Sequence, residues 1–424
     1  AAEPSPTTAG PSTTHAPATN AAPATTAAAP ATTAAPTTTQ APATTAAPVT
    51  TAPAPTTTEP DPAGDPADVI VATLADDAMG GRDNGTDGSR AAQAYLADQL
   101  ALFAEPAFAD GYVQAGESAN VVGIVRGTEL PDEYLVLGAH YDGLGSDCRV
   151  LDPADTICNG ATDNATGTAA ALAAAQRLVA DGAPRRSIVI ALWDREEDGL
   201  LGSADFLADP PVPLDSVVAY LNWDIQGSNL LPSLRDTTLA IGAETGGEPL
   251  VDATRRATDA ADLRYVAFSL IFGQGRSDHA NFVNAGIPSV FFTDVTNGCY
   301  HTTGDDLTIV DFARLDIQVD TATALAADLA ATAELPVFTS APAATFADAE
   351  SMLAVTTGAV ADADLLTALE PGFVEEYLGQ LEAIVAAGES EFDDADTGVL
   401  LGGAATLVAA LAETACDGYL DVAG

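Results

Sequence analysis

Apolar and polar positions follow a regular plan from about residue 68 onward. Short runs rich in Val, Ile, Leu and Phe, of the length expected for buried strands, occupy residues 120–125, 134–138, 187–193, 217–223 and 287–292. Longer stretches with apolar residues at helical spacing occupy residues 68–77, 89–103, 166–180, 248–260 and 278–285. Because strands and helices alternate, we predict an α/β fold, with three α/β/α layers around a mixed, largely parallel central sheet.

The first 66 residues have a different composition. They hold 14 of the 27 prolines and 19 threonines, and Ala fills most other positions. Such a segment cannot bury enough apolar surface to offset the entropy lost on ordering. We therefore expect residues 1–66 to be a disordered Ala/Pro/Thr-rich stalk, either O-glycosylated or a plain spacer. No signal peptide is visible, so we expect the chain to begin after a cleaved one.

Residues 336–424 form a third region, which carries 16 acidic residues and no Arg. Residues 349–360 and 375–387 have helical patterns, and Pro371-Gly372 separates them. We predict an acidic, mainly helical C-terminal extension. A packed appendage, a lid and a C-terminal propeptide all fit this sequence, and the packed appendage is preferred.

The chain is strongly acidic. Its formal net charge is −47, from 61 acidic residues and 14 basic ones, all of which are Arg. Nucleic-acid binding needs a positive surface that faces the phosphates, and a polybasic membrane anchor needs one as well, so neither class is expected. No run of 18 or more apolar residues is present, so we expect no membrane span. The oligomeric state stays unassigned.

Residue types that bind metals gather just past the ends of the predicted strands, where open α/β sheets place their sites. In chain order the set is His140, Asp142, Asp163, Glu196, Glu197, Asp224 and His301. Imidazole and carboxylate ligands in this number suit two zinc ions that share a bridging Asp. Asp142 stands two residues after His140, where it can accept the other imidazole N–H, as a metal-bound His usually requires.

Each of these residues alone also has an ordinary structural explanation. His140 fits a buried core histidine, Asp163 fits a helix N-cap, and Glu196-Glu197 fits a solvated acidic turn. His279 is better explained as a residue at a helix start than as a ligand. The order and separation of all the motifs together therefore carry more weight than any single one.

From about Asp76 to Asp311 the chain resembles the co-catalytic, two-zinc aminopeptidase family of secreted bacterial metallopeptidases. Relatives of that family include glutamate carboxypeptidases, glutaminyl cyclases and transferrin-receptor-type domains. The motifs that carry the resemblance are Gly81-Arg82, Asn120-Val121-Val122-Gly123, His140-Tyr141-Asp142, Ala161-Thr162-Asp163-Asn164, Glu196-Glu197 with Gly199-Leu200-Leu201-Gly202-Ser203, Asp224, Arg276-Ser277-Asp278-His279 and Tyr300-His301-Thr302. The resemblance implies a zinc peptidase catalytic domain at residues 67–335.

The resemblance also implies the metal ligands. Asp163 is expected to bridge two Zn²⁺ ions, with His140 and Asp224 completing one site and Glu197 and His301 completing the other. All five of these residue types are intact in this sequence.

Glu196 is implied as the general base that acts on a metal-activated water. Tyr300, next to a ligand, is either a hydroxyl donor to the tetrahedral intermediate or a core tyrosine. Asp142 is expected to support a ligand. Arg276 is expected either to contact substrate or to form a structural salt bridge.

The predicted function is a secreted zinc-dependent exopeptidase, first of all an aminopeptidase that acts on peptides with a free N-terminus. A carboxypeptidase or dipeptidase would need basic groups for a free carboxylate, and only Arg276 and Arg195 are available. A catalytically silent surface binding module would have lost a ligand or Glu196, and neither is lost. Asp194-Arg195 departs from the family pattern and leaves a glutaminyl cyclase as a weaker alternative, because the stretch 163–167 has the peptidase form.

The chain has four cysteines. Cys148 and Cys158 lie in the segment between two expected ligands, and we expect a disulfide between them. Cys299 has no near partner, and whether it pairs with Cys416 is left open. An even cysteine count with a stalk favours an oxidising compartment, so a secreted or cell-surface location is expected.

Overall fold

The computed structural model describes residues 64–416 apart from 230, 274, 341 and 342. The predicted stalk at residues 1–66 therefore lies almost wholly outside the described residues. The first described helix, α1 (Pro66–Leu74), has Pro at its first position. The carboxylate of Asp65 caps it by accepting the N–H of Ala67 at 2.9 Å.

Eight strands form one sheet in the order β1-β2-β4-β3-β5-β8-β6-β7. Their bounds are β1 (Glu105–Pro106), β2 (Val121–Val125), β3 (Leu130–His140), β4 (Arg186–Trp193), β5 (Val217–Trp223), β6 (Thr237–Ile241), β7 (Arg264–Phe268) and β8 (Ser289–Thr293). Four neighbouring pairs, β3–β4, β3–β5, β5–β8 and β6–β7, are parallel, and β1–β2, β2–β4 and β6–β8 are antiparallel. The predicted mixed α/β sheet is confirmed.

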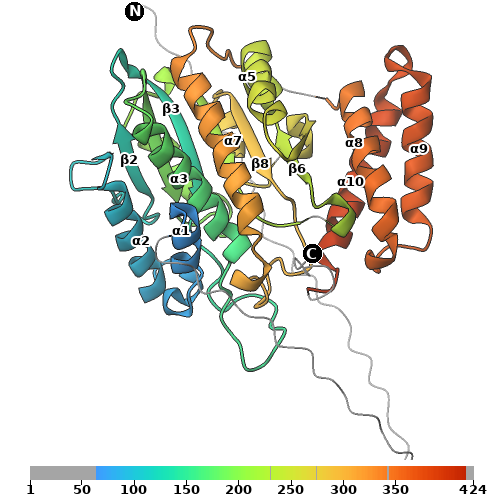
Figure 1. Ribbon diagram of the computed structural model, residues 1–424, viewed down its shortest axis with the longest axis horizontal. Helices are drawn as coiled ribbons and strands as arrows, with labels where there is room; N and C mark the ends of the chain where they lie inside the picture. The colour runs from blue at the N-terminus through green and yellow to red at the C-terminus, as the bar shows by residue number, and fades with distance from the viewer. Residues whose placement is uncertain (1–63, 230, 274, 341–342, 417–424) are drawn as a thin grey trace, which may run out of the picture. The chain divides into compact units, whose positions relative to one another are not determined.

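Helices cover both faces of this sheet. Besides α1, the described residues hold α2 (Asp87–Leu100), α3 (Thr166–Ala180), α4 (Leu201–Ala208), α5 (Gly247–Asp259), α6 (His279–Asn284), α7 (Phe312–Ala331), α8 (Phe346–Ala359), α9 (Phe373–Ala387) and α10 (Asp394–Ala412). Figure 1 shows α3 and α7 crossing one face of the sheet, with α1 and α2 beside α3. Helices α4 and α6 pack on the opposite face through Phe206 and Phe282.

The alternation of side chains along β4 explains why its residues 188–193 are all apolar. Ile188, Ile190 and Leu192 join the core cluster beneath α3 and α7. Val189, Ala191 and Trp193 face the other way and join Phe206, Tyr220 and Phe282. Successive residues of a strand point to opposite faces, so a strand covered on both sides needs apolar residues at every position.

The helical C-terminal part shares its core with the sheet (Figure 1). Met352 of α8 and Leu400 of α10 belong to one buried cluster with Ile241, Phe268 and Phe291 from strands β6, β7 and β8. A second buried cluster joins Leu231 and Leu234 to Leu366, Val374 and Leu411. This shared burial holds the C-terminal helices against the sheet.

Several elements were not identified from the sequence. Strands β6 and β7 and helices α4, α7 and α10 were not among the predicted elements, and β3 begins at Leu130 rather than at Tyr134. Strand β7 lies at the sheet edge and has a mixed burial pattern, so it lacks the continuous apolar run that marks the central strands.

Helix α10 bears on the expectation that the chain has no membrane span. It is 19 residues long with a mean hydropathy of 1.6, so within the described chain it is the one helix that could cross a membrane by length and composition. The sequence search missed it because Asp394 and Asp396 interrupt its first turn. One such helix is weak evidence, because core helices have the same composition. Here α10 packs on α8 and α9.

Candidate active site

The parallel central strands bring the candidate residues to one edge of the sheet. His140 is the last residue of β3 and is paired in register with Trp193, the last residue of β4. Strand β5, on the other side of β3, ends at Trp223, so Asp224 emerges beside His140. Carboxyl ends of parallel strands meet at the same edge, which explains why residues far apart in the sequence converge here.

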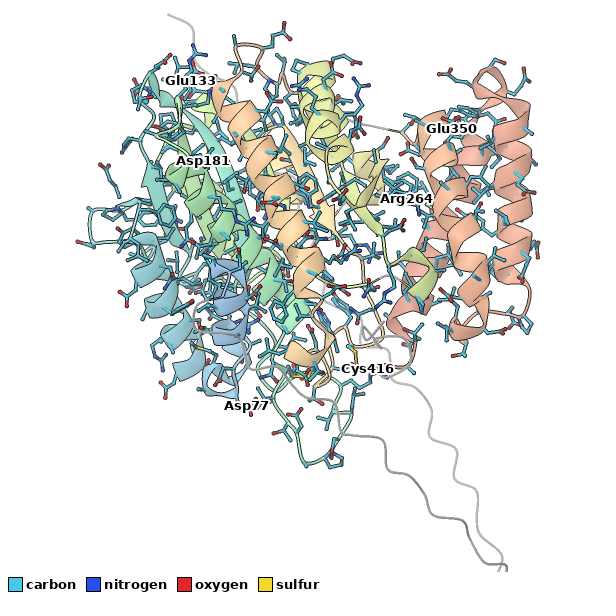
Figure 2. All side chains as sticks on the ribbon, viewed as in Figure 1. Asp77, Glu133, Asp181, Arg264, Glu350 and Cys416 are labelled. Atoms are coloured by element: carbon cyan, nitrogen blue, oxygen red, sulfur yellow. A yellow bond between two sulfur atoms is a disulfide. The ribbon has the colours of Figure 1, made fainter. Side chains whose placement is uncertain are left out.

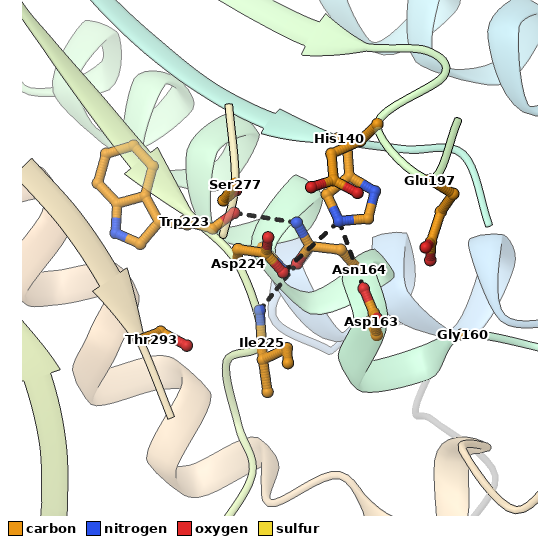
Figure 3. Close-up of polar contacts among 12 residues, drawn as sticks. His140, Gly160, Asp163, Asn164, Glu197, Trp223, Asp224, Ile225, Ser277 and Thr293 are labelled. Carbon is orange, nitrogen blue, oxygen red and sulfur yellow. Dashed lines mark hydrogen bonds and ion pairs between the residues drawn. The ribbon is translucent and has the colours of Figure 1, made fainter. Parts of the chain in front are cut away.

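Two groups of side chains meet at this edge, and Asp163 belongs to both. Figure 3 shows the first group, which consists of His140, Asp163 and Asp224. In the first group, His140 Nε2 lies 3.3 Å from Asp163 Oδ1 and 3.5 Å from Asp224 Oδ1. In the second, His301 Nε2 lies 3.1 Å from Asp163 Oδ2 and 3.3 Å from Glu197 Oε2. The two oxygens of Asp163 therefore face different histidines.

Asp142 supports both groups. Its Oδ1 lies 3.4 Å from His140 Nδ1, the nitrogen that faces away from Asp163. The same carboxylate accepts the backbone N–H of Glu196 at 3.1 Å and that of Glu197 at 3.2 Å. A single buried carboxylate thus fixes the ring of one histidine and the turn that carries the two glutamates.

The side chain of Asp305 anchors the loop that carries Asp163. This carboxylate accepts the N–H and the hydroxyl of Thr162, both at 2.8 Å, and the N–H of Asp163 at 3.0 Å. Asn164 ties the same loop to the end of β5, because its amide donates to the carbonyl of Trp223 at 3.0 Å. The loop is therefore fixed on both sides of Asp163.

Arg82 is fully buried and links the loops around the site. Its guanidinium donates to the carbonyls of Leu74, Tyr141, Asn159 and Gly160 at 2.5–2.8 Å. Burial lowers the pKa of Arg82, and the neighbouring acids oppose that shift. The backbone next to His140 and the backbone before Asp163 are thus held by one cation.

Burial and neighbouring charges together raise the pKa values of two glutamates and one histidine in the site. Burial raises the pKa of Glu197 to about 7, and the charge of Asp163 adds to this effect. Burial opposes protonation of His301, but its hydrogen bonds and charge contacts with Asp163 and Glu197 raise its pKa to about 10. Burial also raises the pKa of Glu196 well above its usual range, and His140 opposes the shift. Closely packed carboxylates of this kind are stabilised by bound cations.

The donor set fits divalent metal ions. In each group, the one imidazole nitrogen and the two carboxylate oxygens lie within 4.8 Å of one another, as atoms around a shared ion must. His301 Nε2 faces one carboxylate oxygen of Asp163 and one of Glu197, at 3.1 Å and 3.3 Å. Imidazole nitrogen and carboxylate oxygen are both donors that Zn²⁺ takes in proteins.

The other predicted site residues surround these groups. Glu196 and Tyr300 line the same cavity as Asp163 and Asp224. The ring of Tyr300 stacks on that of His301 with centroids 3.8 Å apart. Arg276 is exposed on the cavity wall and makes no salt bridge within the described residues. His279, the first residue of α6, is buried against Phe291 with ring centroids 4.5 Å apart.

Both disulfides are present. The predicted Cys148–Cys158 bond closes the loop beside the site, and Cys158 lies near Asp163 and His301. Cys299 is bonded to Cys416, which answers the question that the sequence left open. Figure 2 shows Cys416 near the lower end of the molecule, below α10.

Sequence reasoning missed Asp305 and the role of Arg82. Asp305 follows His301 by four residues, and this closeness to a ligand motif was the available signal. In a chain with 61 acidic residues, one further Asp does not stand out. Arg82 was noted only within Gly81-Arg82, and its contacts depend on loops 59 to 78 residues away.

Comparison with known proteins agrees with this arrangement. Residues 120–326 match the sequence profile of peptidase family M28. The probable glutamate carboxypeptidase LAMP1 of Arabidopsis thaliana is 33% identical over 211 residues, which cover 45% of this chain and 28% of the plant protein. The chain therefore spans well under half the length of this relative.

Two solved structures share the fold. The LapA aminopeptidase of Legionella pneumophila superposes with a TM-score of 0.51 and 20% identity, over 64% of this chain and 71% of that chain. The glutaminyl cyclase of Porphyromonas gingivalis superposes with a TM-score of 0.50 and 21% identity, over 62% of this chain and 96% of that chain. At these identities the likeness concerns the fold alone. The sequence match across residues 120–326 is what relates this part of the chain to peptidase family M28.

Proposed function

We propose that this protein is an extracellular zinc-dependent aminopeptidase with two metal ions. The observation that carries the proposal is the division of Asp163 between two ligand groups, with its oxygens 3.3 Å and 3.1 Å from the Nε2 atoms of His140 and His301. A carboxylate in this position is suited to bridge a pair of ions.

Each ion would have its own ligands beside the shared Asp163. His140 and Asp224 would hold one Zn²⁺, and His301 and Glu197 would hold the other. Zinc in such a site lowers the pKa of water and polarises the scissile carbonyl. The contact of Asp142 with His140 Nδ1 would orient the ring so that the opposite nitrogen could bind the ion, as supporting carboxylates do in zinc sites.

Glu196 would move the proton. Its carboxylate lines the cavity beside Asp163 and Asp224, and its backbone is fixed by Asp142. A buried carboxylate with a raised pKa can take a proton from the attacking water and pass it to the leaving amine. The hydroxyl of Tyr300 stays protonated, because burial and the surrounding acids raise its pKa, so it can donate to the developing oxyanion.

The charge of the site favours the amino end of a substrate. Glu196 and Asp224 line the cavity together with Asp163 and Glu197, and a free α-ammonium group would be attracted there. A carboxypeptidase is the second candidate, because Arg276 is exposed on the same cavity wall and has no acidic partner in the described chain. A guanidinium in that position could bind a free carboxylate.

The two disulfides support an extracellular location, because such bonds persist in oxidising compartments and are rare in the cytosol.

The test compares the wild-type protein with Glu196→Gln on alanine p-nitroanilide, its N-acetylated form and a blocked dipeptide with a free carboxylate. We expect cleavage of the free-amine substrate alone, with kcat lowered roughly 10²–10⁴-fold by the substitution and zinc content unchanged. Glu382→Gln, on the exposed surface of α9, is the matched control. Cleavage of the blocked dipeptide would instead favour the carboxypeptidase.

A further inference from the structure

We propose that helices α8 and α10 form the far wall of an apolar substrate pocket that opens into the candidate metal centre. The pocket would select substrates with a large uncharged side chain, either aromatic or branched aliphatic, at the residue whose carbonyl is attacked. This inference rests on the proposed aminopeptidase function and names its substrate class. It also assigns a specificity role to helices outside the matched region 120–326.

The pocket is a cavity of about 160 Å³ with two chemically different ends. Carboxylates of the candidate metal centre, including Asp163, Glu196 and Asp224, line one end. Away from these acids the lining is largely apolar. Phe268 and Phe291 contribute from the sheet, Val355 from α8, and Leu407 and Val408 from α10. A side chain that enters from the acidic end would therefore leave water for an apolar surface.

The size of the cavity indicates the size of the side chain. A cavity of about 150 Å³ lined by Leu, Ile and Phe accepts benzene, and this cavity is of similar volume. One aromatic ring or one branched aliphatic group would fill it. A methyl group would leave most of the volume empty and would forgo the apolar contacts.

Ile225 is the apolar lining residue that lies next to a candidate ligand in the sequence. It directly follows Asp224, lines the cavity and is only 6% exposed. Its φ of 58° lies in the left-handed region, which is rare for a β-branched residue. The carbonyl of Ile225 accepts the N–H of Asp294 at 2.8 Å, and its N–H donates to Asn164 at 3.3 Å. These contacts hold an apolar side chain directly beside a candidate ligand.

The far wall is fixed to the catalytic sheet and not loosely apposed. Asp348, near the start of α8, accepts the N–H of Ser269 at 2.6 Å and its hydroxyl at 2.7 Å. The hydroxyl of Thr296 donates to the carbonyl of Val408 in α10 at 3.3 Å. Just beyond α10, the Cys299–Cys416 disulfide joins the chain to the residue before Tyr300. A wall held at both ends can define the shape of a pocket.

This arrangement favours the packed appendage over a propeptide. Residues of α8 and α10 enclose the cavity together with the candidate site residues, and the cavity between them stays open. An inhibitory segment would fill that space with its own side chains. The extension is therefore expected to support turnover of large apolar substrates and not to suppress it.

The experiment narrows the pocket from the helical side in the full chain. Ala404 of α10 lines the cavity, and its neighbour Ala405 is exposed and does not. Ala404→Phe and the matched control Ala405→Phe are compared with wild type for kcat/KM on alanine and phenylalanine p-nitroanilides. Calorimetric binding of L-phenylalanine and L-alanine provides a readout that does not depend on turnover. Zinc content and thermal unfolding show whether each variant is folded.

We expect wild type to prefer the phenylalanine substrate by at least about tenfold, the size of discrimination that apolar pockets achieve. Ala404→Phe should abolish that preference by lowering kcat/KM for the phenylalanine substrate, and it should weaken binding of L-phenylalanine, whereas Ala405→Phe should change neither. If Ala404→Phe does not fold, Leu407→Ala tests the same wall, because it enlarges the cavity and should shift the preference toward tryptophan. An unchanged preference in a folded Ala404→Phe would overturn the pocket while leaving the aminopeptidase intact. Absence of any turnover by wild type would overturn the proposed function itself. Faster turnover of every substrate by Ala404→Phe would overturn the pocket and identify the C-terminal extension as inhibitory.

Discussion

Asp305 offers a sharp test of how the loop around Asp163 is held. We consider Asp305→Asn, which preserves the shape of the side chain and changes one oxygen into a hydrogen-bond donor. The natural carboxylate accepts three hydrogen bonds, from the N–H and hydroxyl of Thr162 at 2.8 Å and from the N–H of Asp163 at 3.0 Å. In the variant, an NH₂ group must face at least one of these donors.

The cost follows from burial. Asp305 is 2% exposed, so water cannot replace a lost partner. One unmade buried hydrogen bond costs about 1–3 kcal/mol, which corresponds to a factor of roughly 5 to 150 in an equilibrium constant. We therefore expect zinc to bind about 10–100-fold more weakly to the groups that share Asp163. This is the usual effect of losing a residue that supports a ligand.

Zinc affinity is measured at pH 8 by competition with a chromophoric chelator. At this pH Asp305 is ionised, although burial raises its pKa to about 6. Asp306→Asn is the matched control, because the adjacent carboxylate caps an exposed turn at Thr308 and touches no candidate ligand. Equal zinc affinities for wild type and Asp305→Asn, with Asp306→Asn also unchanged, would refute the reasoning.

Three further predictions concern stability. Burial lowers the pKa of His279 to about 4, so between about pH 6.5 and pH 4 the unfolded chain binds a proton that the folded chain does not, and stability falls as the pH falls. In urea unfolding, His279→Phe should reduce the stability lost between pH 7 and pH 5 by about 2 kcal/mol, and an equal loss in both proteins would count against it. Cys416→Ser opens a bond between residues 117 apart and should lower the free energy of unfolding by about 2–5 kcal/mol; an unchanged urea midpoint would contradict this. Arg82→Lys keeps the charge but cannot reach all four carbonyls, so it should destabilise the fold by more than about 1 kcal/mol, and full stability would show that those contacts are dispensable.

The candidate ligands could be proposed from the sequence because two of them directly follow apolar strands and the others lie in motifs whose order resembles a known family. His140 and Asp224 follow apolar strands directly, and parallel register then brings them together without further information. Asp163 and His301 lie in loops, and they were found through the order of neighbouring motifs. When strands are buried on both faces, the sequence can thus predict that residues just after them meet at one edge of the sheet.

The contribution of the C-terminal helices was not readable in this way. Leu407 and Phe268 line one cavity although they lie far apart in the sequence, and no periodicity records such a meeting. The apolar residues of α10 fit a membrane helix by composition as well as they fit a pocket wall. Only the packing of α10 against the sheet and α8 distinguishes these roles.

The central claim is that two ligand groups share Asp163, and the most direct measurement is the zinc content of the purified chain and two single variants. By elemental mass spectrometry we predict two zinc ions per chain for wild type, and one for each of His140→Ala and His301→Ala, because each substitution dismantles one group and leaves the other. One zinc ion in wild type that is lost in both variants, or no zinc in a folded wild-type chain, would contradict the account.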